Sequence, residues 1–290
     1  MLKNKKYDFI IVGQGLAGTL LAHDLLDSKK RILIIDKHLK ASASKVAGGL
    51  MNPISVRRCI PAFPEYYVET AFKRYRELEE KLNDNFLHTK PLVKLFRNEE
   101  IKDLWHDKYN NHNMDIYIKG FNKTNTFSSF KDTFTSANVE PAGNLDVISF
   151  LRTSKTYFSN ECDFLEEEFD FDFFNENKIS YKAYNSEKIV FCEGYRLINN
   201  PFFNYLPLAP TKGEVITIKI PSLEYCDQII SKGVYLIPLG NHLYTVGATY
   251  NREDLTDEIT GAALDVLPTE PADINHPLVK AYMNREEWLE

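Results

Sequence analysis

The sequence predicts an α/β fold, with a parallel βαβ unit at the N-terminus and an interleaved α+β part built on an antiparallel sheet. Two observations predict this fold. Residues 7–36 contain an apolar run, a glycine-rich turn, a helical stretch and a second apolar run, which is the pattern of two buried parallel strands joined by a helix. Short alternating runs with glycine turns follow at 207–218 and 233–249, as antiparallel strands require.

Composition limits the function classes. The chain has 290 residues, 43% of them apolar and 26% charged, and its net charge of −6 gives no basic footprint for nucleic acid. The four cysteines have no C-x-x-C spacing, so we expect no metal site and free thiols in a reducing, cytoplasmic location. Because no run of about 18 apolar residues occurs, we also expect no integral membrane segment.

Each part of the N-terminal unit suits a dinucleotide. Gly13 permits a tight turn out of the first strand, Gly15 lets a pyrophosphate approach the backbone, and Gly18 lets the helix pack closely on the strand. The helix N-terminus offers N–H groups to the phosphates. Asp36 ends the second strand, where its carboxylate can accept hydrogen bonds from ribose hydroxyls. An acid at this position favours FAD or NAD over NADP.

Local patterns predict several further elements. A helix is expected at about 65–82, with its charged residues on a solvated face. The Asn-rich stretch 109–113 predicts a surface loop. Alternation of Phe with Asp or Asn over 163–185 predicts a strand with one buried face.

Blocks of sequence beyond Asp36 extend the pattern. A small-residue loop covers 42–53, a turn into a helix covers 138–146, and an apolar strand ends in a turn at 188–194. With the two late strand blocks, these residues resemble the D-amino-acid-oxidase-like family of FAD-dependent oxidoreductases, the group of glycine oxidase and sarcosine oxidase. The resemblance covers residues 7–258 and implies a Rossmann-like FAD-binding domain beside a substrate domain, with the C-terminal part incomplete.

The resemblance also implies domain boundaries. Residues 1–55 and about 140–200 would form the FAD-binding domain, and residues about 56–139 and 201–258 the substrate domain. Residues 259–290 would form an atypical tail.

FAD is the cofactor that the resemblance implies, held by backbone and small side chains of three turns and by the end of the second strand. The predicted FAD contacts are Gly13, Gly15, Leu16, Ala17, Gly18, Asp36, Lys37, Ser44, Ala47, Gly48, Gly49 and Gly194. At the last turn the sequence departs from the family, because Cys192 and Glu193 stand where small residues are usual. A buried strand thiol such as Cys192 is expected to be inert.

Members of this family oxidise a C–N bond by passing hydride to the flavin, so the resemblance implies a small-molecule amine or amino-acid substrate. The cofactor supplies the difficult chemistry, so no acid–base pair or nucleophile needs to be visible. Arg57 or Arg58 could hold a substrate carboxylate, and Tyr235 could line the pocket. The alternatives are an exposed arginine pair and a tyrosine packed in the sheet.

The tail at 259–290 resembles a segment of the D-2-hydroxyacid dehydrogenases, in which Glu270 matches the catalytic glutamate. Either the chain is a fusion or truncation near residue 258, or the tail is a divergent end. Three functions stay open. They are an FAD-dependent oxidoreductase that truncation could inactivate, a nucleotide-binding remnant without catalysis, and a fragment of an NAD-dependent 2-hydroxyacid dehydrogenase.

Overall fold

The computed structural model describes residues 5–38, 42–122, 130, 135–221, 223, 226–248 and 262–263. The chain divides into two compact units. Unit 1 comprises Met1–Ala43, Asp163–Gly213 and Tyr250–Glu290, and unit 2 comprises Ser44–Cys162 and Glu214–Thr249. Apart from the short strand β20 (Ala262–Ala263), which pairs with β15 (Thr211–Lys212), the predicted tail and Glu270 lie outside the described residues.

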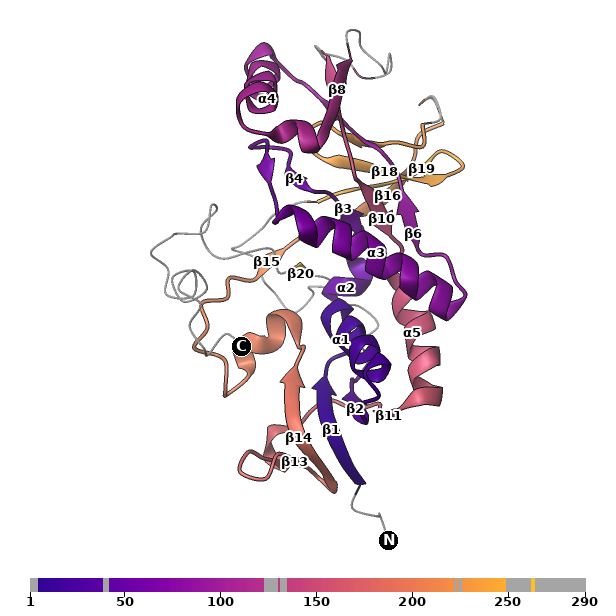
Figure 1. The fold of residues 1–290 in the computed structure, drawn as a ribbon, viewed down its shortest axis with the longest axis vertical. Helices are drawn as coiled ribbons and strands as arrows, with labels where there is room; N and C mark the ends of the chain where they lie inside the picture. The colour runs from indigo at the N-terminus through magenta and orange to yellow at the C-terminus, as the bar shows by residue number, and fades with distance from the viewer. Residues whose placement is uncertain are drawn as a thin grey trace. The chain divides into compact units, whose positions relative to one another are not determined.

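Unit 1 is built on a six-stranded sheet in the order β11-β2-β1-β14-β13-β12. Its strands are β1 (Lys5–Val12), β2 (Ile32–Ile35), β11 (Asp163–Leu165), β12 (Phe174–Asn175), β13 (Ser180–Tyr181) and β14 (Tyr184–Phe191). The first four strands in this order run parallel, and β13 and β12 continue the sheet as an antiparallel edge. Figure 1 shows the indigo β1 and the orange β14 side by side, as their pairing requires.

The central strands are apolar because both of their faces are covered. All four residues of β2 are buried, and Ile10 and Ile11 of β1 have no exposed surface, as in the middle of a parallel sheet. The helix α1 (Leu16–Asp27) connects β1 to β2 and buries Ala22 and His23. The predicted strand–helix–strand order is therefore confirmed.

The prediction of one strand across residues 163–185 is wrong. The segment contains the short strands β11, β12 and β13 and the 3-10 helix η2 (Phe171–Phe173). Phe169 stacks on Tyr181 with ring centroids 4.5 Å apart and meets Phe191 edge-on at 5.5 Å. The phenylalanines therefore converge on one aromatic cluster from several segments, and their alternation does not mark a single sheet face.

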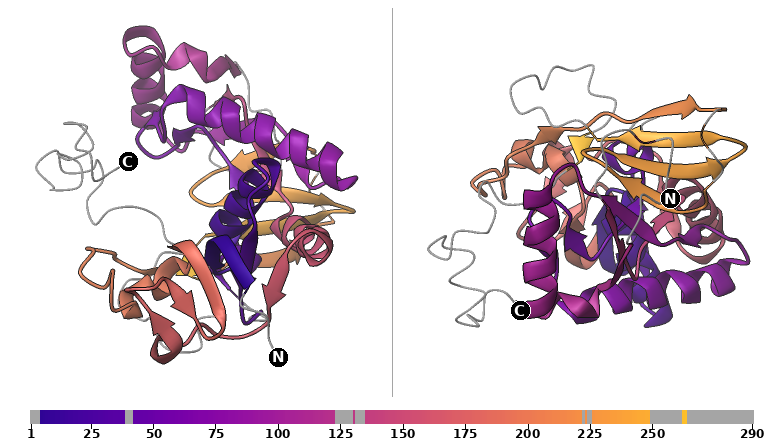
Figure 2. Two further views of the ribbon diagram at one scale, coloured as in Figure 1. Left: turned by 60° about the horizontal axis from the view of Figure 1, so that its bottom comes forward. Right: turned by 90° about the horizontal axis from the view of Figure 1, so that it is seen from above.

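Unit 2 contains a seven-stranded sheet in the order β16-β19-β18-β17-β7-β9-β8. Its strands are β7 (Leu92–Leu95), β8 (Ile118–Asn122), β9 (Ser136–Val139), β16 (Ile216–Lys219), β17 (Ile229–Ser231), β18 (Tyr235–Gly240) and β19 (Leu243–Gly247). All neighbours are antiparallel except the parallel pair β17 and β7. The predicted late antiparallel strands are thus confirmed, and Figure 2 shows them in orange and yellow.

Shorter strands accompany this sheet. β3 (Leu50–Met51), β10 (Gly143–Leu145) and β6 (Leu87–Thr89) form a three-stranded sheet, and β4 (Ile54–Ser55) pairs with β5 (Ile60–Pro61). Residues 44–55 and 140–162 therefore belong to unit 2, whereas the predicted FAD-binding domain included them. The assignment of a function to each unit stays a prediction.

The helices of unit 2 are α3 (Glu65–Leu82), α4 (Glu99–Asn111), the 3-10 helix η1 (Met114–Ile116) and α5 (Val147–Glu161); the short α2 (Ala43–Val46) begins at the last residue of unit 1. α3 has the predicted bounds. α4 runs through most of the predicted loop 109–113, so that prediction is wrong: Trp105 is fully buried and His106 stacks on Phe121 at 3.8 Å, which stabilises the helix. No helix within the described ranges is long and apolar enough to cross a membrane.

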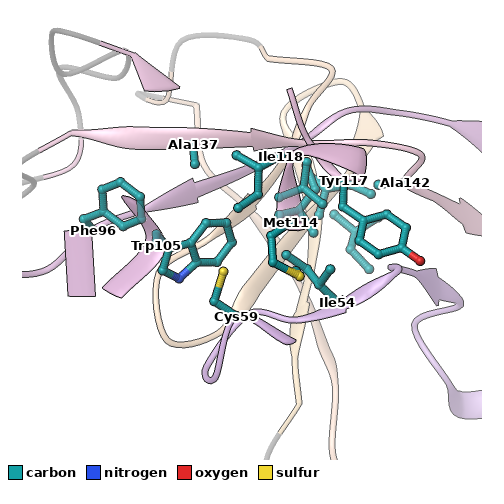
Figure 3. Close-up of a cluster of buried hydrophobic side chains, with 13 residues drawn as sticks. Ile54, Cys59, Phe96, Trp105, Met114, Tyr117, Ile118, Ala137 and Ala142 are labelled. Carbon is teal, nitrogen blue, oxygen red and sulfur yellow. The ribbon is translucent and has the colours of Figure 1, made fainter. Parts of the chain in front are cut away.

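Both faces of the seven-stranded sheet bury apolar side chains. On one face lies a cluster that we call the Trp105 cluster, made of Ile54, Cys59, Leu92, Phe96, Trp105, Met114, Tyr117, Ile118, Ala137, Val139, Ala142, Ile229 and Ile237. Figure 3 shows Phe96, Trp105 and Cys59 within it. A second cluster contains Val93 and Leu95, which alternate in sequence with Leu92 and Phe96 of the Trp105 cluster, so β7 contributes side chains to both faces.

The start of α5 provides a test of local stability. Asp146 caps this helix: one carboxylate oxygen accepts the N–H of Ser149 at 3.0 Å and the other accepts its hydroxyl at 2.7 Å. We expect Asp146→Ala to lower the free energy of unfolding by about 1 kcal/mol, measured by urea denaturation. Asp146→Asn keeps a capping oxygen and should lower the free energy of unfolding by only a few tenths of this amount. An equal decrease in both variants would contradict the capping role.

Candidate functional site

The turn between β1 and α1 requires glycine at two positions. Gly13 has φ of +101°, and a Cβ on it would lie 2.4 Å from the carbonyl oxygen of Cys192. A Cβ on Gly18 would lie 1.9 Å from the carbonyl oxygen of Gly13. The N–H of Gly13 donates to the carbonyl of Ile35 at 2.8 Å. The turn is therefore packed tightly between the ends of β2 and β14.

The N-terminal end of α1 begins directly after this turn. Gly15 is its N-cap, with φ −78° and ψ −168°, and Leu16 and Ala17 begin its first turn. Gly15 has no side chain that could accept a hydrogen bond from the first N–H groups, and the first turn contains no acidic residue. Because the first N–H groups of a helix have no partner within the helix and mark the positive end of its dipole, this end suits a phosphate.

Asp36 is fixed beside the glycine turn. Its Oδ2 accepts the N–H of Gln14 and its Oδ1 accepts the N–H of His38, each at 2.7 Å. The side chain is 22% exposed, and a carboxylate has about four acceptor positions. The Nδ1 of His38 also lies 3.4 Å from Oδ1, so at least one acceptor position, on Oδ2, remains for a hydroxyl donor such as that of a ribose.

Lys37 takes part in an ion-pair network. Its Nζ lies 2.7 Å from Glu168, which also pairs with Arg196 at 3.2 Å. Hydrogen bonding from Lys37, with the charge of Arg196, lowers the pKa of Glu168. The structure thus gives this predicted cofactor residue a protein partner at the same edge of unit 1.

The turn after β14 lies against the same glycines. The N–H of Cys192 donates to the carbonyl of Val12 at 2.7 Å, and Gly194 has φ of +60° with open space where a Cβ would stand. Burial raises the pKa of the Cys192 thiol to about 11, so it is protonated at neutral pH and unsuited to act as a nucleophile. Glu193 accepts a hydrogen bond from the fully buried Asn200 at 2.6 Å, and burial raises its pKa. Sequence reasoning missed Asn200, because the pair forms only through η3 (Gly194–Asn199).

Ser44 to Pro53 of the small-residue loop belong to unit 2. Gly49 has φ of +66°, and a Cβ on it would lie 1.9 Å from the carbonyl oxygen of Leu145, so it must be glycine to pack on β10. A Cβ on Gly48 would make ordinary contacts of 3.5 Å with Ile237 and 3.6 Å with Thr245. Ser44 lies in α2, and Ala47 follows that helix.

Tyr235 is hydrogen-bonded to Asn52, near the end of this loop. The Nδ2 of Asn52 donates to the carbonyl of Ile54 at 2.6 Å and to the hydroxyl of Tyr235 at 3.3 Å. Asn52 is a further candidate that sequence reasoning did not select. Arg57 and Arg58 lie on the turn between β4 and β5, where Arg57 is exposed and Arg58 is half-buried.

Unit 1 fits the adenosine and pyrophosphate half of a dinucleotide. The backbone donors at the start of α1 suit phosphate oxygens, and the spare acceptor position of Asp36 suits a hydroxyl group. A group of three or more His, Cys, Asp or Glu side chains that could hold a metal ion is absent from the described part of the chain. The geometry therefore supports a nucleotide as the ligand of this turn.

Replacing Asp36 tests this arrangement. Asp36→Asn keeps the size of the side chain but leaves it one acceptor oxygen, so either Gln14 or His38 loses its partner. We expect the affinity for FAD to fall by about tenfold, because the ribose loses a hydrogen bond to a charged acceptor, which contributes about 1.5–3 kcal/mol. Titration of FAD followed by flavin fluorescence measures the change. The control Asp24→Asn makes the same charge change at an exposed position of α1; equal affinities for both variants would contradict the role of Asp36.

Comparison with known proteins agrees with this geometry. Residues 8–283 match the family described as FAD dependent oxidoreductase (DAO), so the match continues beyond residue 258 and into the tail. Among curated proteins, an uncharacterized protein of Methanosarcina barkeri is 31% identical over 105 residues, which make up 36% of this chain and 26% of that protein. The chain thus matches about a quarter of that relative's length.

Solved structures share the fold. Glycine oxidase from Geobacillus kaustophilus is 19% identical, with a TM-score of 0.68 over 87% of this chain and 73% of that chain. L-amino acid deaminase from Proteus vulgaris is 15% identical, with a TM-score of 0.64 over 84% of this chain and 61% of that chain. At these identities the likeness shows a common architecture.

Proposed function

Because this chain belongs to the family of FAD-dependent oxidoreductases, we propose that it binds FAD and oxidises the C–N bond of an amino acid or amine. The observation that carries the proposal is the glycine turn with Asp36 fixed beside it, in a chain that matches the family over residues 8–283. The fold shared with glycine oxidase and L-amino acid deaminase supports the C–N bond as the target.

The residues of unit 1 hold the nucleotide half of the cofactor in this proposal. Gly13, Gly15 and Gly18 let the pyrophosphate approach the backbone at the positive end of α1. The carboxylate of Asp36 accepts a ribose hydroxyl. Gly194 and Lys37 border the same turn.

The proposal also includes the predicted residues of the small-residue loop and Tyr235. The loop with Ser44, Ala47, Gly48 and Gly49 supplies close backbone contacts to the cofactor. Bound FAD supplies the two-electron oxidation by accepting hydride from the carbon that bears the nitrogen. The hydroxyl of Tyr235, held by Asn52, orients the substrate.

Anaerobic mixing of the FAD-loaded protein with a panel of substrates tests the function. Matched pairs such as alanine with lactate and glycine with glycolate differ only in nitrogen or oxygen at the reacting carbon. The proposal predicts bleaching of the flavin absorbance by members with nitrogen and none by their hydroxy partners. Bleaching only by the hydroxy acids would contradict C–N oxidation, and bound flavin that no amine or amino acid bleaches would indicate a nucleotide-binding remnant without catalysis.

A further inference from the structure

Lys94 places a charged group inside the core of unit 2. It is 6% exposed and lies at the third position of β7. Successive residues of a strand point to opposite faces, so Lys94 shares a face with Leu92 and Phe96, both members of the Trp105 cluster. Its cross-strand partner on β9, Ala137, belongs to the same cluster.

The ammonium group of Lys94 has no carboxylate or other hydrogen-bond acceptor beside it among residues 5–38, 42–122, 130, 135–221, 223 and 226–248. The charge that acts on it most is that of Arg97, which repels it. Burial, with this repulsion, lowers the pKa of Lys94 to about 8. A buried cation without a counter-charge is costly, and its presence requires an explanation.

Polar groups on the neighbouring strands continue from Lys94 along the same face. Ser231 on β17 is its cross-strand partner, and Tyr235 on β18 is the partner of Ser231. Partners across strands point to the same face of a sheet. Lys94, Ser231 and Tyr235 therefore form a polar row across three strands, with Cα atoms of Lys94 and Tyr235 about 10 Å apart.

The small-residue loop contacts this same face. Gly48 lies against Ile237 and Thr245; Ile237 stands two residues after Tyr235 on β18 and pairs with Thr245 on β19. The hydroxyl of Tyr235 receives the amide of Asn52. The loop predicted to contact the cofactor and the polar row therefore share one face of one sheet.

We propose that Lys94 binds the carboxylate of the substrate on this face, with the hydroxyls of Ser231 and Tyr235 as neutral donors. This inference rests on the proposed function and narrows its substrate class to amino acids. One cation with hydroxyl donors balances a single negative charge, as a monocarboxylate carries. In the low-dielectric core the pairing is stronger than it is at Arg57, which is exposed and screened by solvent.

Binding of a simple carboxylate tests the proposal without turnover. The probe is propionate, and its neutral isostere propionamide is the control ligand. Affinity is measured by calorimetry with the purified chain, both loaded with FAD and free of it. The variants are Lys94→Met, Arg58→Met and Lys102→Met, the last an equivalent change at a partly exposed lysine of α4 that pairs with Glu99.

The proposal predicts that the wild-type protein binds propionate more tightly than propionamide, and that Lys94→Met lowers the affinity for propionate by tenfold or more, since a charge-assisted hydrogen bond contributes about 1.5–3 kcal/mol. Arg58→Met and Lys102→Met should change it by less than about twofold. Equal binding of propionate and propionamide, unchanged binding in Lys94→Met, or a loss confined to Arg58→Met would overturn it. A protein that binds FAD but not propionate would refute this inference and leave the proposed function standing, whereas a protein that binds propionate but does not take up FAD would refute the proposed function.

Discussion

Gly13→Ala is expected to abolish FAD binding and to destabilise unit 1 by about 4 kcal/mol. Two costs combine. A side chain at φ of +101° is strained by about 1–3 kcal/mol, and the new Cβ would lie 2.4 Å from the carbonyl oxygen of Cys192. Relieving such an overlap costs about 1–3 kcal/mol more, because the opposing atom is backbone. The turn that faces the pyrophosphate then shifts together with the end of β14.

Hydrogen exchange of the β1 and β14 amides measures the stability of unit 1, and flavin fluorescence measures the binding. Gly240→Ala is the matched control, because its φ is +93° but nothing lies within 4 Å of the added Cβ. This control should show the strain alone and should retain FAD. If Gly13→Ala bound FAD as tightly as Gly240→Ala did, the close packing of the turn would not matter for the cofactor.

Lys94→Met is expected to raise the free energy of unfolding at pH 7 by up to about 3 kcal/mol. The pKa of Lys94 falls from 10.5 to about 8 on folding, and each pKa unit corresponds to about 1.4 kcal/mol. Replacing an unpaired buried charge with an apolar side chain of similar length removes this cost. Lys94→Met is therefore expected to stabilise the protein while it removes the affinity for carboxylate.

The pH dependence of the stability difference between Lys94→Met and the wild type distinguishes the cost of the buried charge from a change in packing. Between about pH 8 and pH 10.5 the unfolded chain still binds a proton that the folded protein has lost, so the stability of the wild type rises with pH in this window. Below about pH 8 both states are protonated and the full cost is present. The advantage of Lys94→Met should therefore be constant below pH 8 and shrink up to pH 10.5 in urea denaturation. A constant advantage across this window would show that Lys94 keeps its ordinary pKa.

The N-terminal unit was predictable because its determinants are local. Three glycines, a helix and two apolar strands occupy one continuous stretch of about 30 residues, and a Cβ added to Gly13 or Gly18 would overlap a specific carbonyl oxygen. The bounds of α3 were likewise predicted from its own stretch of sequence. The prediction of a loop at the end of α4 was wrong because the contact of His106 with Phe121 stabilises the helix more than the low helix propensity of the Asn-rich residues destabilises it.

The remaining candidate site depends on pairing between distant residues. Asn52 and Tyr235 are 183 positions apart, and Lys94 meets Ser231 only through the register of β7 and β17. A one-residue change of register would move Lys94 to a different partner and alter the row. The sequence could name Tyr235 as a candidate, but the buried position of Lys94 becomes apparent only in the folded sheet.

The central claim is that this chain holds FAD, and the visible absorbance spectrum of the purified protein tests it most directly. The spectrum is recorded before and after incubation with FAD and removal of the free cofactor. The account predicts a protein-bound flavin spectrum with about one FAD for each chain, lost in Gly13→Ala and retained in Gly240→Ala. A protein that stays colourless after incubation would contradict the account.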